Sequence, residues 1–425
     1  MKNALVAATV IVSLAITAVI LNRSALLEWL TLYEYSQLFA VDAIDENFRA
    51  MHLTNTSVRV PHQGPVFQLV EPTPGKNINF TYRIENETRR LDDLLKATNT
   101  TGFAIFHDGK LVRESYFRGN TRETHAIQMS VSKSFASFLV GVAIDEGKIR
   151  SVDDFVTTYV PTLMGSAFDG VTIKQVLEMS SGIKWDEDYG KLNSEIVRSI
   201  VATRLGSLDE FATTIERESP PGELHHYASI NTHVLGMVVR GATGMEYADY
   251  FEQKLWRKLG AEADAFFITD TQNQPLVLGG LSIRLRDMIR FGALYLENGR
   301  NHLGEQLVST DWVAESTTPD APRLMPGKNN PKSKTWFGYK YQWWIPLTPD
   351  HGDYSAIGIY GQFIYVNPAR RIVIAKTSAY SDYLKDGGWK DVETLLAFQS
   401  IARALSPLPD DGAGHQTADA GYGAP

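Results

Sequence analysis

Strand patterns occur near both ends of the chain, and this placement constrains the fold more than any other feature of the sequence. Gly102–His107 and Lys110–Phe117 are apolar or β-branched runs joined by Asp108-Gly109, a strong hairpin signal. Gly361–Val366 and Arg371–Lys376 form a second such pair. Because the segment between the pairs has mostly helical and loop patterns, the sequence predicts an α/β plus all-α fold. We expect one antiparallel sheet, completed by both ends of the chain and flanked by helices, with a helical insertion domain.

Apolar residues at spacings of three and four predict the helices. The clearest pattern covers Val131–Glu146, where Phe135, Leu139 and Val142 share one face and Gly147 provides a C-cap. The other predicted helices are Val171–Met179, Glu195–Leu205, Leu208–Glu216, Asn231–Ala242, Tyr247–Leu259, Arg286–Leu296 and Asp391–Ala404.

The composition excludes several classes of protein. The 425 residues are 44% hydrophobic and include no cysteine. Intrinsic disorder, a disulfide scaffold and a cysteine-ligated metal site are therefore excluded. The formal net charge of −8 argues against a nucleic-acid partner, which requires a basic face.

The first residues form a separate segment. Ala4–Leu21 contains no charged residue, and a helix of that length would span about 27 Å, close to the thickness of a bilayer core. Residues 1–35 are therefore predicted to be a membrane anchor or signal segment. Anchoring through residues 4–21 would leave the rest of the chain exported, on the periplasmic or extracytoplasmic side. A cleaved signal peptide is the alternative, although the segment has no A-x-A site.

The predicted domain boundaries follow from these patterns. Residues 36–100 have turn signals but no strong period, and are predicted to be an N-terminal extension. Residues 101–405 are predicted to form one domain, with a sheet part at about 101–145 and 280–405 and a helical part at about 146–279. Residues 406–425 are rich in glycine, alanine, proline and aspartate, which is typical of a disordered tail.

Two Ser-x-x-Lys tetrads occur in the chain, at Ser130–Lys133 and Ser181–Lys184. Ser130 opens a long apolar helix, so that Ser130 and Lys133 lie on one face and the serine hydroxyl lies at the positive helix end. A lysine that is desolvated among apolar groups loses its charge more easily and can accept a proton from the serine. Ser181 is followed by Gly182, which indicates a loop. The alternative role for Ser130 is a simple helix N-cap.

Ser130–Lys133 at the start of an apolar helix resembles the nucleophile motif of the serine β-lactamase and penicillin-binding-protein superfamily. Other segments resemble that superfamily in the same order, over about residues 101–405. The chain most resembles the 6-aminohexanoate-dimer hydrolase-like branch of amidases and esterases, whose architecture is class C β-lactamase-like. The resemblance implies a β-lactamase/transpeptidase-like fold. The segments are Asp145–Ile149, Tyr159–Pro161, Val171–Gly182, Pro221–Tyr227 and Gly279–Leu281.

The resemblance also implies roles for individual residues. Ser130 would be the acylated nucleophile, and Lys133 would accept or relay its proton. Tyr227 would share the base role as a phenolate-like group next to the Lys133 cation, and would later protonate the leaving group. The backbone N–H groups of Ser130 and Ile359 would form the oxyanion hole.

Two motifs depart from the superfamily pattern. The second motif is Tyr227-Ala228-Ser229, where β-lactamases commonly have Tyr-x-Asn. The third is Ala356-Ile357-Gly358, so the cation that holds a substrate carboxylate is missing. Lys376 lies on the next strand and is interpreted as part of a strand end. A small-molecule amide or ester substrate is therefore expected. The alternatives are a penicillin-binding D-alanyl carboxypeptidase or weak β-lactamase, and a non-catalytic binding protein on the same fold.

Aromatic residues are candidates for substrate binding. The loop Trp185–Tyr189 resembles the lid of the dimer hydrolases, in which Tyr189 would close over the substrate. Trp185, Trp343 and Trp344 are candidate wall residues, with core packing as the alternative for each tryptophan. Gly358 in the third motif is a further candidate.

The sequence gives little support for a metal or an organic cofactor. His225 and His226 are adjacent, so on an extended segment they would point to opposite faces. No His-x-x-His partner lies nearby, and no metal site or cofactor is predicted. A Ser-His-Asp triad is also not favoured, because the chain has no Gly-x-Ser-x-Gly elbow.

Overall fold

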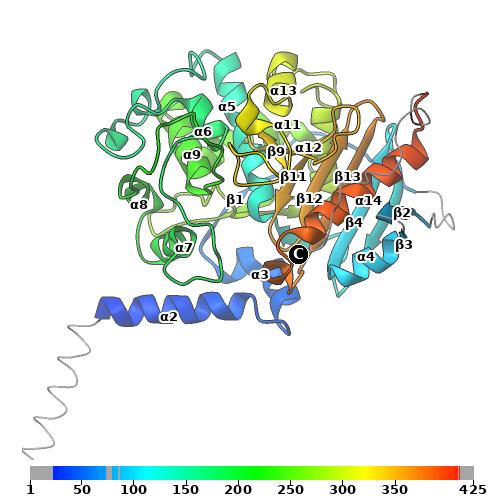
Figure 1. Cartoon of the computed structure of the whole chain (residues 1–425), viewed down its shortest axis with the longest axis horizontal. Coiled ribbons are helices and arrows are strands. Elements are labelled where there is room, and N and C mark those ends of the chain that lie inside the picture. The colour runs from blue at the N-terminus through cyan, green and yellow to red at the C-terminus, as the bar shows by residue number, and fades with distance from the viewer. Residues whose placement is uncertain (1–22, 73–78, 85–86, 410, 412–425) are drawn as a thin grey trace, which may run out of the picture.

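The computed structural model describes residues 23–72, 79–84, 87–409 and 411. Its main sheet has seven antiparallel strands in the order β5-β4-β13-β12-β11-β10-β9 (Figure 1). The two hairpins predicted from the sequence are β4–β5 and β12–β13, and they meet where β4 pairs with β13. Both ends of the domain therefore complete one sheet, as predicted. The strands are β4 Thr100–His107, β5 Lys110–Tyr116, β9 Gly338–Lys340, β10 Trp343–Ile345, β11 Tyr354–Gly358, β12 Gln362–Asn367 and β13 Ile372–Ser378.

Alternate residues of the main sheet face two different cores, as the two-residue period of a strand requires. Phe103 and Ile105 pack with Phe398 of helix α14, whereas Ala104 and Phe106 belong to the core on the other face. Helices α4 and α14 and the hairpin β2–β3 cover the first face (Figure 1), and helix α12 packs on the second. These elements are β2 Thr81–Ile84, β3 Glu87–Arg90, α4 Leu91–Ala97, α12 Leu285–Leu296 and α14 Trp389–Leu405.

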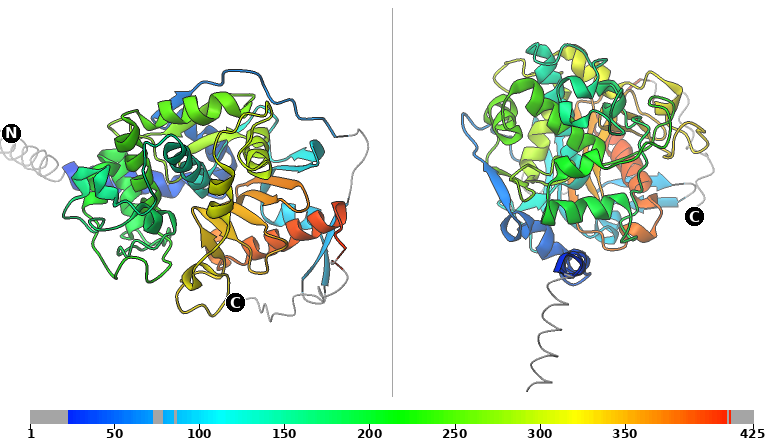
Figure 2. Two further views of the ribbon diagram at one scale, coloured as in Figure 1. Left: turned by 90° about the horizontal axis from the view of Figure 1, so that it is seen from above. Right: turned by 90° about the vertical axis from the view of Figure 1, so that its left-hand side faces the viewer.

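The helical part lies beside the main sheet, as the left-hand view in Figure 2 shows. Helix α5 (Ser132–Asp145) runs between the two parts and is buried over most of its length, because its side chains are small or apolar on all sides. It packs against α9 and contacts β11. The remaining elements are η2 Val156–Thr158, η3 Pro161–Leu163, α6 Ile173–Leu177, α7 Glu195–Leu205, α8 Leu208–Thr213, α9 Ile230–Thr243, α10 Tyr247–Phe251, the π-helical η4 Glu252–Trp256, α11 Arg257–Leu259, α13 Thr310–Thr317, η5 Pro322–Leu324 and η6 Tyr383–Lys385.

Two predicted helices differ from the structure. The predicted helix Val171–Met179 is limited to α6, which begins at a capping box of Thr172 with Gln175 and is followed by Met179 at φ +52°. The predicted helix Tyr247–Leu259 is divided into α10, η4 and α11 by a change to π-helical hydrogen bonding. The periodicity predicts these segments but not the capping box at which α6 begins or the change to π-helical hydrogen bonding after α10.

The N-terminal segment contains regular structure that its sequence pattern did not predict. It forms α2 (Arg23–Leu38), α3 (Ile44–Thr54) and β1 (Ser57–Val60). β1 pairs with β7 (Ala265–Ile268), whose sequence lies more than 200 residues later. With β8 Leu281–Arg284 and β6 His125–Ile127 they form a second antiparallel sheet in the order β1-β7-β8-β6.

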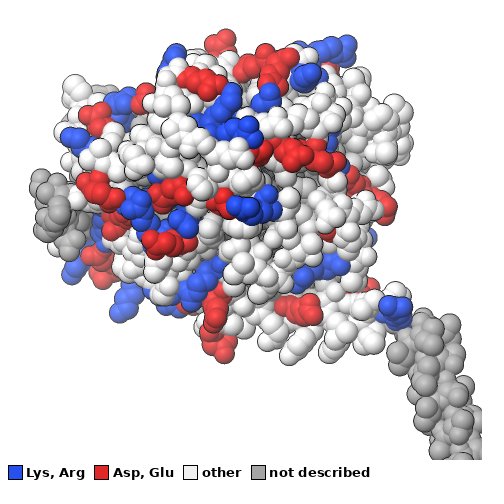
Figure 3. Space-filling view, turned by 180° about the vertical axis from the view of Figure 1, so that it is seen from behind, with Lys and Arg blue, Asp and Glu red and all other residues white. Residues whose placement is uncertain are grey.

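Among the residues that the structure describes, no helix is long and apolar enough to cross a membrane. The predicted anchor, residues 4–21, and most of the predicted tail lie outside the described residues. The first tail residues contact the body, because Arg370 binds Asp411 and the Ser406 carbonyl. Basic and acidic residues are interspersed over the back face of the molecule (Figure 3).

Candidate active site

Ser130 lies in a 3-10 turn, η1 (Met129–Val131), immediately before α5. Its neighbour Met129 has φ +48°, an uncommon backbone conformation for a residue with a side chain. No side-chain hydrogen bond caps α5. The Ser130 Oγ instead lies 2.8 Å from the Lys133 Nζ, so Ser130 does not act as a simple N-cap.

Lys133 is buried one helical turn after the serine, with 1% of its surface exposed. Its Nζ also donates a hydrogen bond to the Leu278 carbonyl at 2.5 Å. Desolvation by burial lowers the pKa of Lys133 from 10.5 to about 7, and the negative charge of Glu187 opposes this shift. A large share of the amine is therefore neutral near pH 7, with a lone pair that can accept a proton from Ser130.

Tyr227 comes from the loop before α9. Its ring stacks on Trp344 with centroids 5.0 Å apart, and the Lys133 Nζ lies 5.4 Å from the ring centroid. Burial, followed by the Glu187 charge, raises the pKa of Tyr227 above its usual value, although hydrogen bonds with Ser130 and Ser229 act in the opposite direction. The phenol therefore stays protonated at neutral pH, in contrast to the phenolate-like Tyr227 expected from the sequence. A protonated phenol is suited to donate a proton.

The end of β11 packs against the backbone of the serine turn. A Cβ on Gly358 would lie 2.6 Å from the Gln128 carbonyl oxygen and 3.1 Å from the Ser130 nitrogen, so only glycine fits without a shift. Ile359 follows directly, and Tyr360 has φ +63°. This close approach brings the backbone of Ile359 to the serine, where the oxyanion hole is predicted. Gly358 therefore allows the end of β11 to approach the serine turn closely.

Glu187, which no sequence motif indicated, organises the predicted lid loop. Its carboxylate accepts hydrogen bonds from the Tyr189 hydroxyl at 3.0 Å, from the Ser229 backbone N–H at 3.0 Å and from the Ser229 hydroxyl at 2.5 Å. The Trp185 indole N–H also donates to it. Glu187 thus ties the lid loop to the motif that contains Tyr227. No local pattern could reveal this, because the partners come together only in the fold.

An open cleft lies next to Ser130, and its empty space, including the part open to solvent, is about 1030 Å³. Its lining is largely apolar but carries the charged side chains of Glu187, Lys334 and Asp391, and we call it the polar cleft after these groups. It contains two of the five candidate substrate-binding residues, Tyr189 and Trp344, together with the predicted Tyr227 and Ile359. It also contains residues that the sequence analysis did not single out. These are Lys334, Thr335, Phe337, Tyr383, Leu384 and Asp391.

The structure corrects the prediction for two tryptophans. Trp185 is 4% exposed and belongs to the core, and its indole N–H binds Glu187, so it is not part of the polar cleft wall. Trp343 is fully buried and lies with its ring parallel to Phe291, at a centroid distance of 6.1 Å. Neighbouring residues on a strand point to opposite faces, which explains why Trp344 reaches the cleft and Trp343 does not.

The third-motif position and Lys376 also differ from a β-lactamase site. Ala356 is 1% exposed and belongs to the core. Lys376 is buried in β13, where its Nζ donates to the Gly361 carbonyl at 3.2 Å and lies 2.6 Å from the Ser378 Oγ. Burial lowers the pKa of Lys376 to about 7. Lys376 therefore supports the loop after Ile359 from behind and does not line the cleft.

The adjacent histidines have separate partners. The His225 Nδ1 lies 3.0 Å from the Ser333 Oγ, and burial lowers the pKa of His225 to about 3. His226 faces the cleft near Lys334. Within the described residues, one group of three potential metal ligands occurs, at Asp350, His351 and Asp411. Arg370 binds both of its carboxylates, which makes the group an ion-pair cluster.

The fold and site together define a class of protein. An antiparallel sheet flanked by helices, a helical insertion, and a serine with a buried lysine one turn later are the features of the β-lactamase/transpeptidase-like fold. The family model described as "Beta-lactamase" matches residues 88–388, and the chain belongs to this family.

Relatives of known sequence and structure support this assignment. The chain is 33% identical to a 6-aminohexanoate-dimer hydrolase of Paenarthrobacter ureafaciens over 311 residues, which cover 71% of this chain and 78% of that protein. It is 25% identical to a β-lactamase of Providencia stuartii over 44% of this chain and 51% of that protein. A protein of Bacillus anthracis assigned as a 6-aminohexanoate-dimer hydrolase has the same fold, with a TM-score of 0.78 and 22% identity over 88% of this chain and 97% of that one.

Proposed function

We propose that this protein is a serine hydrolase that cleaves an amide or ester bond through an acyl-enzyme on Ser130. The observation that carries the proposal is the 2.8 Å contact between the Ser130 Oγ and the Nζ of a buried lysine whose pKa is lowered to about 7. An amine with this pKa is matched to general-base work near neutral pH. The similarity to amide-cleaving relatives supports the same reaction type.

In the first step the Ser130 Oγ attacks the substrate carbonyl carbon. A new C–O bond forms, the carbonyl π electrons move to the oxygen, and the serine proton passes to the neutral Lys133 amine. The backbone N–H groups of Ser130 and Ile359 donate to the oxyanion. Each donor of this kind is worth about 3 kcal/mol of barrier.

In the second step the bond to the leaving nitrogen or oxygen breaks and the carbonyl forms again. Tyr227 gives its proton to the leaving atom and recovers one from the Lys133 ammonium, so that the base is neutral again. Water then attacks the acyl-enzyme along the same route, and Ser130 is restored with release of the acid.

The substrate expected is an uncharged amide or ester rather than a penicillin-like carboxylate. The buried Ala356 occupies the position of the third-motif cation. Among the described residues that line the cleft, the lysine is Lys334, whose side chain is 53% exposed and whose Nζ lies 3.6 Å from the Glu218 carboxylate. Solvent screening weakens an exposed charge of this kind.

The test is covalent labelling of the full chain with a fluorophosphonate probe, followed by peptide mass spectrometry. We expect one adduct, on Ser130, with Ser181 unlabelled. A folded protein that resists the probe would contradict the proposal and favour a binding protein on the same fold. A fluorescent penicillin in the same assay separates the proposed hydrolase from a D-alanyl carboxypeptidase, in which Ser130 would form a stable adduct.

A further inference from the structure

A second hollow meets the polar cleft at the nucleophile. We call it the apolar pocket, and its empty space, including the part open to solvent, is about 770 Å³. Ser130, Tyr189 and Ile359 line both hollows. The reacting carbonyl would therefore lie at the junction of two spaces of different chemistry.

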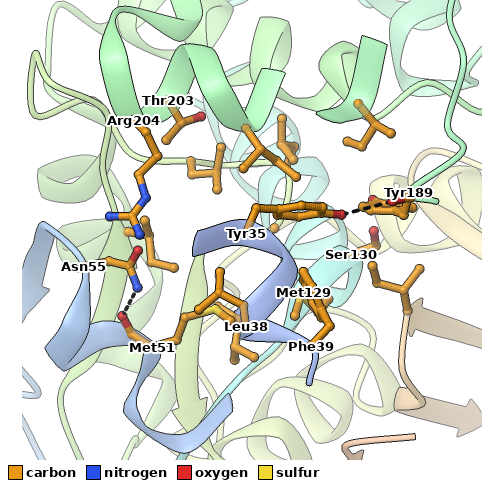
Figure 4. A pocket seen from close by; sticks show the side chains of 18 residues that line it. Tyr35, Leu38, Phe39, Met51, Asn55, Met129, Ser130, Tyr189, Thr203 and Arg204 are labelled. Atoms are coloured by element: carbon orange, nitrogen blue, oxygen red, sulfur yellow. Dashed lines mark hydrogen bonds between the residues drawn. The ribbon is translucent and has the colours of Figure 1, made fainter. Parts of the chain in front are cut away.

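The apolar pocket is built largely by segments whose structure the sequence did not predict. Helix α2 provides Tyr35 and Leu38, Phe39 follows the helix directly, and α3 provides Met51. The opposite wall comes from α7, through Ile196 and Ile200, and from residues 276–279. In Figure 4 the side chains of Tyr35, Leu38 and Met51 lie along one part of the lining, with Ser130 at one end of the pocket.

The lining is apolar along its length. Polar side chains occur at its two ends, with Ser130 and Tyr189 at one end and Asn55, Thr203 and Arg204 at the other (Figure 4). The Tyr35 hydroxyl turns toward the Tyr189 carbonyl at 3.5 Å and leaves its ring facing the hollow. A flexible aliphatic chain matches such a lining, because it gains free energy from burial without leaving a polar group unpaired.

The position of Tyr227 sets the direction of the substrate. The acid that protonates the leaving group must lie beside the leaving atom. Tyr227 lines the polar cleft and is not part of the apolar pocket wall. The leaving group therefore occupies the polar cleft, and the acyl part extends the other way, past Ser130, into the apolar pocket.

We propose that the apolar pocket binds a linear aliphatic acyl chain, and that the N-terminal helices α2 and α3 determine the accepted chain length. This inference rests on the proposed hydrolase function. It names the substrate class as esters or amides of medium-chain aliphatic acids, with the polar group on the leaving side.

The experiment is the kcat/KM of the full chain for p-nitrophenyl acetate, butyrate, hexanoate and octanoate, which share one leaving group. Each buried methylene is worth about fourfold, which corresponds to about 0.8 kcal/mol. We expect a rise on the order of 100-fold between acetate and hexanoate.

Two substitutions in the wall and one matched control test the role of the N-terminal helices. Met51→Trp fills the end of the pocket far from Ser130, and we expect the octanoate-to-acetate ratio of kcat/KM to fall about tenfold or more. Tyr35→Ala removes a wall residue that is 8% exposed, and the ratio should fall as chain burial is lost. Tyr33→Ala lies on the same helix at a side chain that is 53% exposed, and the ratio should stay unchanged.

The outcomes separate this inference from the proposed function. A flat or falling chain-length profile in an enzyme whose Ser130 is labelled by fluorophosphonate overturns the acyl pocket and leaves the hydrolase proposal standing. An equal change of the ratio in the Tyr33 and Tyr35 variants also overturns it. Absence of Ser130 labelling overturns the function itself. Because the ratio compares two esters on one preparation, partial misfolding of a variant cancels out.

Discussion

Ser130-Val131-Ser132-Lys133 and Ser181-Gly182-Ile183-Lys184 have the same spacing in two regions of the molecule. In the first, the lysine is buried and its Nζ lies 2.8 Å from the serine Oγ. In the second, the Ser181 hydroxyl donates to the Asn231 Oδ1 at 2.8 Å, while Lys184 is exposed and binds Glu216 at 3.1 Å. The first tetrad leads into a helix, which brings residues three apart onto one face, whereas the second contains Gly182 at φ +74° and is not helical.

The two lysines show what this difference does to chemistry. Burial lowers the pKa of Lys133 to about 7, whereas the hydrogen bond with Glu216 raises the pKa of Lys184. One amine can accept a proton at neutral pH and the other cannot. The motif therefore supplies the residue types, and the environment supplies the reactivity.

The largest expected contrast is between the two serines. Ser130→Ala should reduce ester hydrolysis about 10³-fold or more, because the nucleophile is lost. Ser181→Ala should keep its activity but lose about 1–3 kcal/mol of unfolding free energy, because the buried Asn231 oxygen loses its donor. Initial rates and urea unfolding measure the two effects, and equal activity of both variants would contradict the assignment.

The lysines should differ in the same way. Lys133→Met should reduce kcat/KM about 10²–10⁴-fold, the usual contribution of a general base. Lys184→Met should leave both kcat/KM and the melting temperature unchanged, because an ion pair in water contributes little. Comparable losses of activity in both variants would remove Lys133 from the role of base.

Gly358 and Gly182 provide a matched pair of substitutions, of which one is expected to affect activity and the other stability. Gly358→Ala should reduce kcat about 10²–10³-fold, because the new methyl group pushes the backbone of the oxyanion hole away from Ser130. Gly182→Ala should cost about 1–3 kcal/mol of stability, because Gly182 has φ +74° and an added Cβ would lie 2.2 Å from the Ser219 carbonyl oxygen. The Gly182→Ala molecules that remain folded should keep their activity. A Gly358→Ala variant with normal kcat would refute this geometry.

The smallest effect expected is on pH dependence. Lys133 acts as a base only when neutral, so kcat/KM should rise about tenfold per pH unit below its pKa of about 7 and level off above it. Glu187 raises the pKa of Lys133, so Glu187→Gln should move the rising limb to lower pH. A limb that does not move would mean that another group controls the profile.

Local sequence predicted many of the elements that surround the reacting residues. The hairpins β4–β5 and β12–β13 and the helices α5, α7, α9, α12 and α14 lie close to their predicted positions. Each has a pattern that repeats within one segment, so a short window contains the information. The pairing of Ser130 with Lys133 was predictable for the same reason, since the two are three residues apart.

Residues that act together across long sequence distances were not predictable in this way. Glu187 meets Ser229 from 42 residues away, and β1 meets β7 from more than 200 residues away. Trp185 was expected at the substrate and lies in the core instead. The sequence around a charged loop residue or a tryptophan does not indicate which distant residue that side chain will contact.

The sequence by itself therefore determined the family, the proposed nucleophile and the positions of the two hairpins and the main helices, because these depend on residue identity and on neighbours along one segment. Only the tertiary structure decided that Lys133 is desolvated enough to lose its charge near neutral pH and that Tyr227 keeps its proton. It also decided that α2 and α3 form the wall of an apolar pocket beside Ser130. The physical reason is that desolvation and enclosure belong to the packed surroundings of a side chain, and those surroundings come from distant parts of the chain.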